Sequence, residues 1–258
     1  MNSINNIAII LQARTGSTRL PNKMLLPFFN GKTILEIIVL NLLNYFSANQ
    51  IIIATTVSSN DDELEQIANE LGVNCFRGDE QNVLDRFIKA ADYYKANHLI
   101  RVCADNPLLQ ASYVKQLAES FLNKPDNIDY LSFAFPDGTP VIKSHIGLFA
   151  EATTISALKK VQKLTTEKLY CEHVTNYFYA NTSVFNVDFL ELPTVLQNRK
   201  DIRLTIDTRE DFETMQDIVS KNCSKNNYEI SIPEILNYLD KNTHLLKSMA
   251  NEIERNSK

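Results

Sequence analysis

The N-terminal part of this 258-residue sequence, up to Cys103, alternates between short apolar runs and amphipathic segments. The apolar runs have the length of buried strands, and the intervening segments have the apolar spacing of helices. The predicted strands are 7–11, 50–55, 73–76 and 99–103, and the predicted helices are 34–46, 61–71 and 83–96. Connections of this length join parallel strands with a right-handed crossover. The pattern therefore predicts an α/β protein with a doubly wound, mostly parallel sheet.

The alternation loosens after the fourth predicted strand. Residues 128–180 combine a Pro-Asp-Gly turn with helical patterns at 156–162 and 167–179, which predicts a small inserted lobe within one domain of residues 1–258. The aromatic content of this lobe predicts a homodimer contact there. The aromatic residues in question are Tyr130, Phe133, Phe135, Tyr177 and Phe178.

The C-terminal part returns to regular patterns. Residues 202–206 predict a strand, and Asp207 or Thr208 is the expected N-cap of the helix that follows. The pattern after Tyr228 is helical and increasingly polar.

Charge and hydropathy exclude several classes of partner. A net charge of −5 argues against binding to a nucleic acid polymer. The apolar stretch 34–43 is shorter than the ~20 residues of a membrane span, and the N-terminus lacks the basic region of a signal peptide. We therefore expect a cytoplasmic protein with no membrane role. Its four cysteines have no metal-binding spacing and are expected to be reduced.

Three cations lie among small residues directly after the first predicted strand. The segment reads Gln12-Ala13-Arg14-Thr15-Gly16-Ser17-Thr18-Arg19-Leu20-Pro21-Asn22-Lys23. Ligands of doubly wound sheets bind beyond the carboxyl ends of the strands, where small residues let backbone N–H groups approach a phosphate. Arg14, Arg19 and Lys23 would neutralise its charge. The segment predicts a phosphate site, and a plain surface turn is the alternative.

The same segment resembles the signature of the acylneuraminate and Kdo cytidylyltransferases, especially the spore-coat polysaccharide cytidylyltransferase branch. Further blocks of that family follow in order within residues 7–215: Phe76–Glu80 with Val83–Arg86, Arg101–Leu108, Glu172–Thr175 and Arg203–Asp211. The resemblance implies a Rossmann-like nucleotidyltransferase fold. It also implies transfer of CMP from CTP to an acidic sugar, of the nonulosonic-acid or Kdo type, with release of pyrophosphate for surface glycan or polysaccharide biosynthesis.

Two aspartates follow predicted strands, and the resemblance implies that they hold magnesium. They are Asp105 and Asp207, and together with Arg14 and Lys23 they are the expected catalytic residues. Carboxylate oxygens suit a magnesium ion that also binds phosphates. The alternative is that Asp207 caps a helix and Asp105 opens a turn.

The resemblance also implies which residues meet the nucleotide. They are Gln12, Ala13, Arg14, Thr15, Gly16, Ser17, Arg19, Lys23, Asn82, Arg86 and Asp105. For Arg86, an ion pair with Asp79 or Asp85 is an equally good interpretation.

The resemblance implies three residues that bind the acceptor sugar: Glu151, Glu172 and His173. The family commonly has a Gly-Leu-Asp-x-Glu segment before its Glu-His block, whereas the counterpart here, Gly147-Leu148-Phe149-Ala150-Glu151, has Phe149 in place of the acidic residue. Because that segment is expected to face the acceptor, the substitution bears on which sugar acid binds. A lone histidine on a helix is more often structural, so a role for His173 as a base stays open.

Three other functions share parts of this pattern. A sugar-1-phosphate nucleotidyltransferase uses similar loop chemistry but usually has a glycine-richer opening. A glycosyltransferase is expected to have an Asp-x-Asp triplet, which the sequence lacks. A non-catalytic nucleotide-binding module would keep the loop without turnover.

Overall fold

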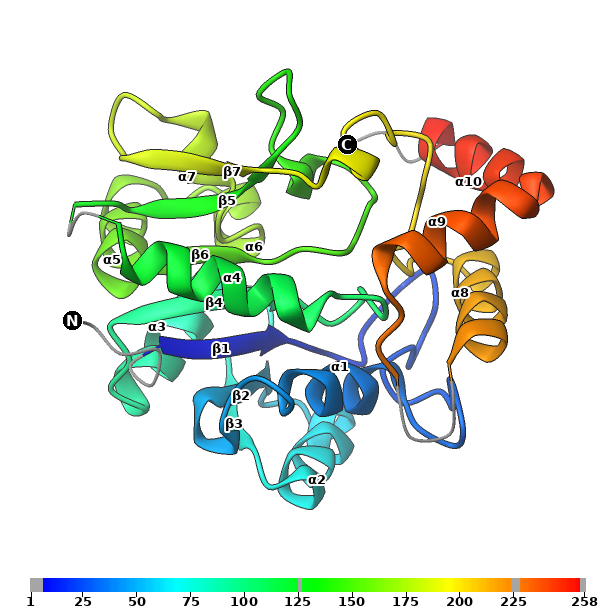
Figure 1. Ribbon diagram of the computed structural model, residues 1–258. Coiled ribbons are helices and arrows are strands. Elements are labelled where there is room, and N and C mark those ends of the chain that lie inside the picture. The colour runs from blue at the N-terminus through cyan, green and yellow to red at the C-terminus, as the bar shows by residue number, and fades with distance from the viewer. Residues whose placement is uncertain (1–6, 125–126, 224–227, 256–258) are drawn as a thin grey trace.

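The computed structural model describes residues 7–124, 127–223 and 228–255, and these form one seven-stranded sheet with helices on both faces (Figure 1). The strands are β1 (Ile7–Gln12), β2 (Ile51–Thr56), β3 (Asn74–Gly78), β4 (His98–Cys103), β5 (Tyr130–Ala134), β6 (Glu151–Thr154) and β7 (Val187–Glu191). The helices are α1 (Ile34–Leu42), α2 (Asp62–Leu71), α3 (Val83–Tyr93), α4 (Ala111–Leu122), α5 (Ile155–Leu164), α6 (Lys168–Glu172), α7 (Asn176–Ala180), α8 (Arg209–Asn222), α9 (Ile232–Lys241) and α10 (Thr243–Arg255).

The strand order is β3-β2-β1-β4-β6-β5-β7. Strand β6 runs antiparallel to both of its neighbours, β4 and β5, whereas every other neighbouring pair is parallel. The prediction of a doubly wound, mostly parallel sheet is confirmed. The apolar runs of β1 and β2 have no polar face because helices cover both sides of these strands.

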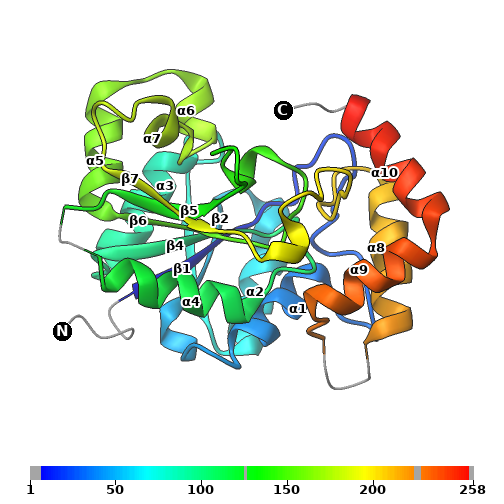
Figure 2. The same cartoon turned by 45° about the horizontal axis from the view of Figure 1, so that its top comes forward.

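Two apolar cores flank the sheet. Alternate residues of β1 point to opposite faces, so Ile9 and Leu11 join the core under α1, α2 and α4, while Ala8 and Ile10 join the core under α3, α5 and α7. Helices α8, α9 and α10 extend the first core and lie together beyond the carboxyl end of β1 (Figures 1 and 2). They therefore form one wall at the edge where ligands of this architecture bind.

Two predicted elements differ in the structure. Residues 202–206 are buried but form no strand, because Leu204 N–H donates to the His145 carbonyl and Ile206 N–H to the Asp105 carbonyl, which belong to two different loops. The single helix predicted at 167–179 is also wrong. It is divided into α6 and α7, and the break turns Thr175 toward the interior.

The range predicted as an inserted lobe, 128–180, contributes β5 and β6 to the central sheet. Tyr130, Phe133, Phe135 and Phe178 are buried within the chain. The apolar surface expected from these residues is therefore absent, and they no longer argue for a dimer contact. A homodimer stays a prediction without that support.

Helix length and hydropathy also bear on membranes. Among the described residues, none of the helices has both the length and the apolar character needed to span a bilayer.

Candidate active site

The loop after β1 is anchored at Thr15. Its N–H and Oγ1 both donate to Asp61 Oδ1, at 2.8 and 2.6 Å. Its carbonyl accepts from the backbone N–H groups of Ser17 and Asn22, at 2.7 and 3.2 Å. The buried side chain of Leu20 anchors the loop to the core. Thr15, predicted to contact the nucleotide, has its side chain turned into the protein. The loop shape depends on it, whereas the neighbouring Gly16 is exposed.

Asp61 links this loop to β2. Its second oxygen accepts from the hydroxyls of Thr55 and Thr56, at 2.9 and 2.6 Å. Burial alone would raise the pKa of Asp61, but the hydrogen bonds from Thr15, Thr56 and Thr55 outweigh it and lower the pKa below its ordinary value. The carboxylate therefore stays charged. The sequence identified Asp61 only as a helix start, and no pattern marks it as a loop anchor.

Cations and carboxylates from three distant segments meet beyond the carboxyl ends of β1 and β4. Lys23 Nζ donates to the Ile206 carbonyl at 2.6 Å, and it lies 3.7 Å from Asp105 Oδ2 and 3.9 Å from Asp207 Oδ1. Arg19 Nη2 lies 2.8 Å from the same Asp207 oxygen. The structure thus brings together four residues that the sequence predicted for this site, and both carboxylates converge on Lys23.

This donor set fits magnesium. Among residues 7–124, 127–223 and 228–255, no group of three or more His, Cys, Asp or Glu side chains is placed to hold a metal ion by itself. Magnesium is usually bound through one or two carboxylates together with substrate phosphates and water. Asp105 and Asp207 supply that pair of hard oxygen ligands, and the remaining ligands would come from the nucleotide and solvent.

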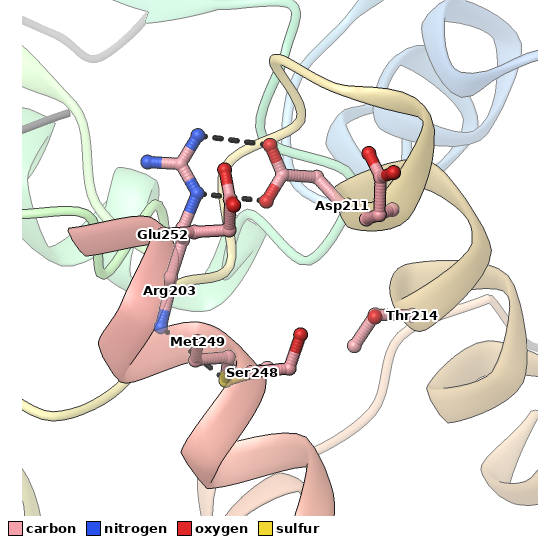
Figure 3. A pocket seen from close by; sticks show the side chains of 7 residues that line it. Arg203, Asp211, Thr214, Ser248, Met249 and Glu252 are labelled. Carbon is pink, nitrogen blue, oxygen red and sulfur yellow. Dashed lines mark hydrogen bonds and ion pairs between the residues drawn. The ribbon is translucent and has the colours of Figure 1, made fainter. Parts of the chain in front are cut away.

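Asp207 is held by the buried Arg203. Arg203 Nε and Nη2 donate to the two oxygens of Asp211, at 2.7 and 2.8 Å, and Nη2 donates to Asp207 Oδ2 at 3.0 Å. Figure 3 shows Arg203 facing Asp211 beside the α10 residue Met249, whose sulfur accepts from the Arg203 N–H. Arg203 Nη1 lies 2.6 Å from His145 Nδ1, and since guanidinium only donates, this nitrogen accepts.

Asp211 completes this arrangement. Burial alone would raise its pKa, but hydrogen bonds from Arg203 and from the N–H groups of Asp207 and Thr208 lower it below the ordinary value. Thr208 is the N-cap of α8 and forms a capping box with Asp211. Of the two predicted caps, Thr208 is therefore correct. Asp207 lies outside the helix with its carboxylate toward Lys23.

Arg14 lies between two glutamates. Its Nη1 is 3.9 Å from Glu80 Oε1 and its Nη2 is 3.7 Å from Glu172 Oε1. A side chain at Gly16 would place its Cβ 3.2 Å from Glu80, so the small residue keeps this approach open. The contact brings Glu172, predicted for the acceptor, to the loop after β1, residues 13–23, which is the predicted phosphate loop. His173 follows it at the exposed end of α6.

Arg86 is fully buried. Its Nη1 donates to the Asp79 carbonyl at 2.7 Å, and no described carboxylate forms an ion pair with it; Asp85 pairs with Lys89. Its Nε and Nη2 have no hydrogen-bond partner among the described residues. Burial lowers the pKa of Arg86 to about 10, and nearby Arg14 acts in the same direction. The side-chain ion pair proposed as an alternative is therefore wrong. Asn82 caps α3.

Glu151 is buried, contrary to its predicted contact with an acceptor. Arg101 Nη1 and Tyr130 Oη each donate to its carboxylate at 2.6 Å, and Thr175 Oγ1 donates at 3.0 Å. Arg101 Nη2 also donates to Gln12 Oε1 at 3.3 Å. Glu151 thus helps to fix the end of β1, and its burial leaves no carboxylate surface for an acceptor. A lone arginine in an apolar strand was the signal for this buried pair.

The segment before Glu151 also packs inward. Phe149 is buried against Phe133 and Tyr113, with ring centroids 4.6 and 5.4 Å away. Gly147 has a φ of +61°, and a Cβ there would come within 2.9 Å of the Leu204 carbonyl oxygen. The substitution at Phe149 therefore extends the core, and it places no side chain toward an acceptor.

Comparisons with known proteins agree with this geometry. The profile of a family described as "Cytidylyltransferase" matches residues 8–239. The chain is 39% identical over 236 residues to an uncharacterized protein of Methanocaldococcus jannaschii, covering 92% of this chain and 91% of that protein. It is 30% identical over 244 residues to the spore coat polysaccharide biosynthesis protein SpsF of Bacillus subtilis, covering 93% and 96%.

Two further similarities point the same way. Over 189 residues the chain is 25% identical to a 3-deoxy-manno-octulosonate cytidylyltransferase of Vesicomyosocius okutanii, covering 67% of this chain and 75% of that one. A solved cytidylyltransferase structure from Leptospira borgpetersenii superposes with a TM-score of 0.82 at 31% identity, covering 93% of this chain and 96% of that chain.

Proposed function

This chain belongs to the cytidylyltransferase family, and from that premise we propose that it transfers CMP from CTP to an acidic sugar and releases pyrophosphate. The proposed acceptor is a nonulosonic acid or a Kdo-like acid, and the product would serve surface glycan or polysaccharide biosynthesis. Similarity to a 3-deoxy-manno-octulosonate cytidylyltransferase supports an acidic acceptor, and similarity to a spore coat polysaccharide biosynthesis protein supports a role in polysaccharide biosynthesis. Because CTP is made in the cytoplasm, we place the reaction there.

One observation carries the proposal. Asp105 and Asp207, from two other segments, each have a carboxylate oxygen within 4 Å of the Lys23 ammonium group. The three residues meet at the ligand-binding edge of the sheet. A site for polyphosphate needs cations, and a site for magnesium needs carboxylates. This cluster supplies both, with Arg14 and Arg19 adjacent in the same loop.

The proposed reaction is an in-line displacement at the α-phosphorus of CTP. The acceptor hydroxyl oxygen forms the new bond to phosphorus and loses its proton to water. The bond from the α-phosphorus to the bridging oxygen breaks, and that oxygen leaves with pyrophosphate. Arg14, Arg19 and Lys23 would neutralise charge on the phosphate oxygens, so catalysis is mainly positioning and electrostatic stabilisation.

Magnesium, held by Asp105 and Asp207, would supply further charge neutralisation and orient the phosphates. Arg203 contributes indirectly. It holds Asp207 Oδ2 while Asp211 fixes the guanidinium, so the other oxygen, Asp207 Oδ1, keeps its direction toward Lys23 and Arg19. This rigidity suits a ligand that must be placed within a fraction of an ångström.

The test is pyrophosphate release with CTP, UTP, GTP and ATP, each offered with Kdo, N-acetylneuraminate and neutral sugars. We expect release with CTP and a sugar acid, and a CMP-sugar in the mass spectrum of the products. Omitting magnesium should abolish the signal. Faster release with UTP or GTP than with CTP, or a product without CMP, would contradict the proposal.

A further inference from the structure

His145 is a buried histidine whose ring meets the guanidinium group of Arg203. Both side chains are buried, and Arg203 Nη1 lies 2.6 Å from His145 Nδ1. A guanidinium group only donates hydrogen bonds, so Nδ1 accepts and carries no proton. A doubly protonated ring would offer no lone pair and would bring a second positive charge against the arginine. The contact therefore requires a neutral imidazole with its proton on Nε2.

The backbone around His145 holds this imidazole in place. The carbonyl of His145 accepts the N–H of Leu204 at 2.8 Å, and Leu204 is the neighbour of Arg203. Two residues after His145, the backbone at Gly147 packs so closely that a Cβ there would lie 2.9 Å from the Leu204 carbonyl oxygen. The loop that carries His145 thus contacts residues 203–204 through its backbone as well as through the imidazole.

Arg203 divides its hydrogen-bond donors between two carboxylates and His145. Nε and Nη2 donate to Asp211, and Nη2 also donates to Asp207 Oδ2 at 3.0 Å. Figure 3 shows the third nitrogen, Nη1, turned away from Asp211. In the part of the chain that the structure describes, His145 is the acceptor at this nitrogen. A buried donor without an acceptor is costly, so in the absence of His145 the guanidinium would turn toward another oxygen.

Asp207 is the carboxylate that such a turn would affect. Its Oδ2 is bound by Arg203, whereas its Oδ1 lies 2.8 Å from Arg19 Nη2 and 3.9 Å from Lys23 Nζ, at the candidate active site. A guanidinium that turns toward Asp207 would take more of the carboxylate's charge and would change the direction of Oδ1. Because His145 satisfies Nη1, Asp207 keeps a single hydrogen bond from Arg203.

We propose that His145 is a positioning residue for the metal-binding carboxylate of Asp207 and that it acts through Arg203. The inference rests on the proposed function, in which Asp207 is a magnesium ligand. In this role His145 contacts neither nucleotide nor metal. It keeps the direction and the charge of Asp207 Oδ1, and groups that hydrogen-bond to metal ligands commonly change metal affinity by about 10- to 100-fold.

The experiment compares His145→Leu, His145→Asn and the control Tyr238→Phe. Leucine removes the acceptor and keeps much of the volume, whereas the asparagine Oδ1 takes roughly the place of Nδ1 and can still accept. Tyr238 Oη donates to Asp217 at 2.6 Å and links α9 to α8. Its loss weakens the same wall of the site without touching Arg203.

The readout is the gain in CTP affinity that magnesium gives. Calorimetry measures the Kd of CTP with magnesium and with EDTA, and the ratio of the two values is the gain. For His145→Leu we expect the gain to fall about 10-fold, the lower end of the range for partners of metal ligands, because the effect passes through Arg203. The Kd in EDTA should not change. His145→Asn should keep most of the gain, and Tyr238→Phe should keep all of it.

Several outcomes overturn the inference: a wild-type gain in His145→Leu, an equal loss in Tyr238→Phe, or a loss of CTP affinity in His145→Leu that is the same with and without magnesium. Absence of any gain in the wild type also overturns it. If His145→Leu does not fold, His145→Gln replaces it, because the longer side chain places its oxygen near the position of Nε2. A loss in His145→Gln that His145→Asn does not show supports the inference, and equal gains overturn it.

Failure of the proposed function gives a different result. Absence of pyrophosphate release with every acceptor contradicts that function, whereas the calorimetric comparison needs no turnover and still decides the role of His145. Where release is observed, the magnesium concentration for half-maximal turnover at saturating CTP should rise in His145→Leu in parallel with the lost gain. An unchanged magnesium requirement in that variant would overturn the inference and leave the cytidylyltransferase function intact.

Discussion

Arg14 and Lys23 are held to different degrees, so their substitutions separate catalysis from stability. The Lys23 side chain is 12% exposed and donates to a backbone carbonyl, whereas the Arg14 side chain is 37% exposed with glutamates at 3.7 and 3.9 Å. Replacing Arg14 with alanine should reduce turnover by ~10²-fold, the effect of removing a preorganised donor. It should change stability by less than about 1 kcal/mol.

The measurements for Arg14→Ala are steady-state kinetics and urea unfolding. Lys89→Ala is the control, because Lys89 is exposed and, within the part of the chain that the structure describes, pairs with Asp85 on its own helix. A turnover rate close to that of wild type in Arg14→Ala would remove this arginine from the phosphate site.

Replacing Asp105 or Asp207 with asparagine removes the negative charge and keeps the shape of the side chain. Asp207→Asn keeps an oxygen for Arg203, and Asp211 still holds that guanidinium, so folding should survive. The loss of a negative charge at a magnesium ligand should lower turnover by orders of magnitude and shift its magnesium dependence. Asp105→Asn should do the same. Wild-type turnover with an unchanged magnesium optimum in both variants would show that these carboxylates are structural.

A site residue could be predicted from the sequence when a neighbouring strand determines its place, and could not when distant contacts do. Asp105 closely follows the buried strand β4 and Lys23 belongs to the loop that follows β1, so an apolar run predicts their place at the ligand-binding edge. The contacts of Glu151 depend on Arg101, which is 50 positions away, and no spacing rule predicts that pair.

At the scale of elements, the sequence predicted those helices and strands whose apolar residues form a strong local pattern. Strands β1 and β2 are continuous apolar runs buried on both faces, and the sequence predicted both. Strand β6 has four residues and includes Glu151 and two threonines. Such a polar composition predicts an exposed segment, whereas most of β6 is buried. Helix α4 buries Ala111, Val114, Leu117 and Phe121 at helical spacing, so the sequence contained a signal that the prediction overlooked.

The start of α8 supports a prediction about pH. The Asp211→Asn variant leaves the buried Arg203 charge without its main partner, which should cost about 3 kcal/mol or more at pH 7. The folded-state pKa of Asp211 lies below its ordinary value, so the carboxylate stabilises the fold above that ordinary value of about 4. This stabilisation disappears as the pH falls through the lowered pKa.

Urea unfolding of wild type and Asp211→Asn between pH 7 and pH 3 tests this difference. The gap between them should be largest above about pH 5 and should narrow as the pH falls. Asp201→Asn is the matched control, because Asp201 is an exposed partner of Arg199 and its loss should cost less than about 1 kcal/mol. A gap that stays constant with pH would show that Asp211 contributes by packing alone.

On the scale of the whole molecule, the site joins two segments that lie far apart in the chain. The hydrogen bond from Lys23 to the Ile206 carbonyl spans 183 residues, and Asp207 leads directly into α8. The segment that leads into α8 therefore meets the loop after β1 through polar contacts of Ile206 and Asp207, in addition to the apolar packing of α8 to α10. A ligand that binds Lys23, Asp105 and Asp207 together should strengthen this connection.

CTP with magnesium should therefore stabilise the whole fold. A ligand at 100 times its Kd that binds only the folded state adds about 2.7 kcal/mol, which raises Tm by roughly 5–10 °C for a chain of this size. The shift should be larger for CTP than for UTP, GTP or ATP. Lys23→Ala, which removes the contact common to all three segments, should lose it.

Hydrogen exchange distinguishes this coupling from local binding. If the nucleotide ties the phosphate loop to the C-terminal helices, amides of α8 and α9 should exchange more slowly with CTP present, although neither helix lies in the loop. Protection confined to residues 13–23 would mean that the ligand occupies the loop without joining the two ends. An equal Tm shift with all four nucleotides would mean that the site recognises the triphosphate and does not read the base.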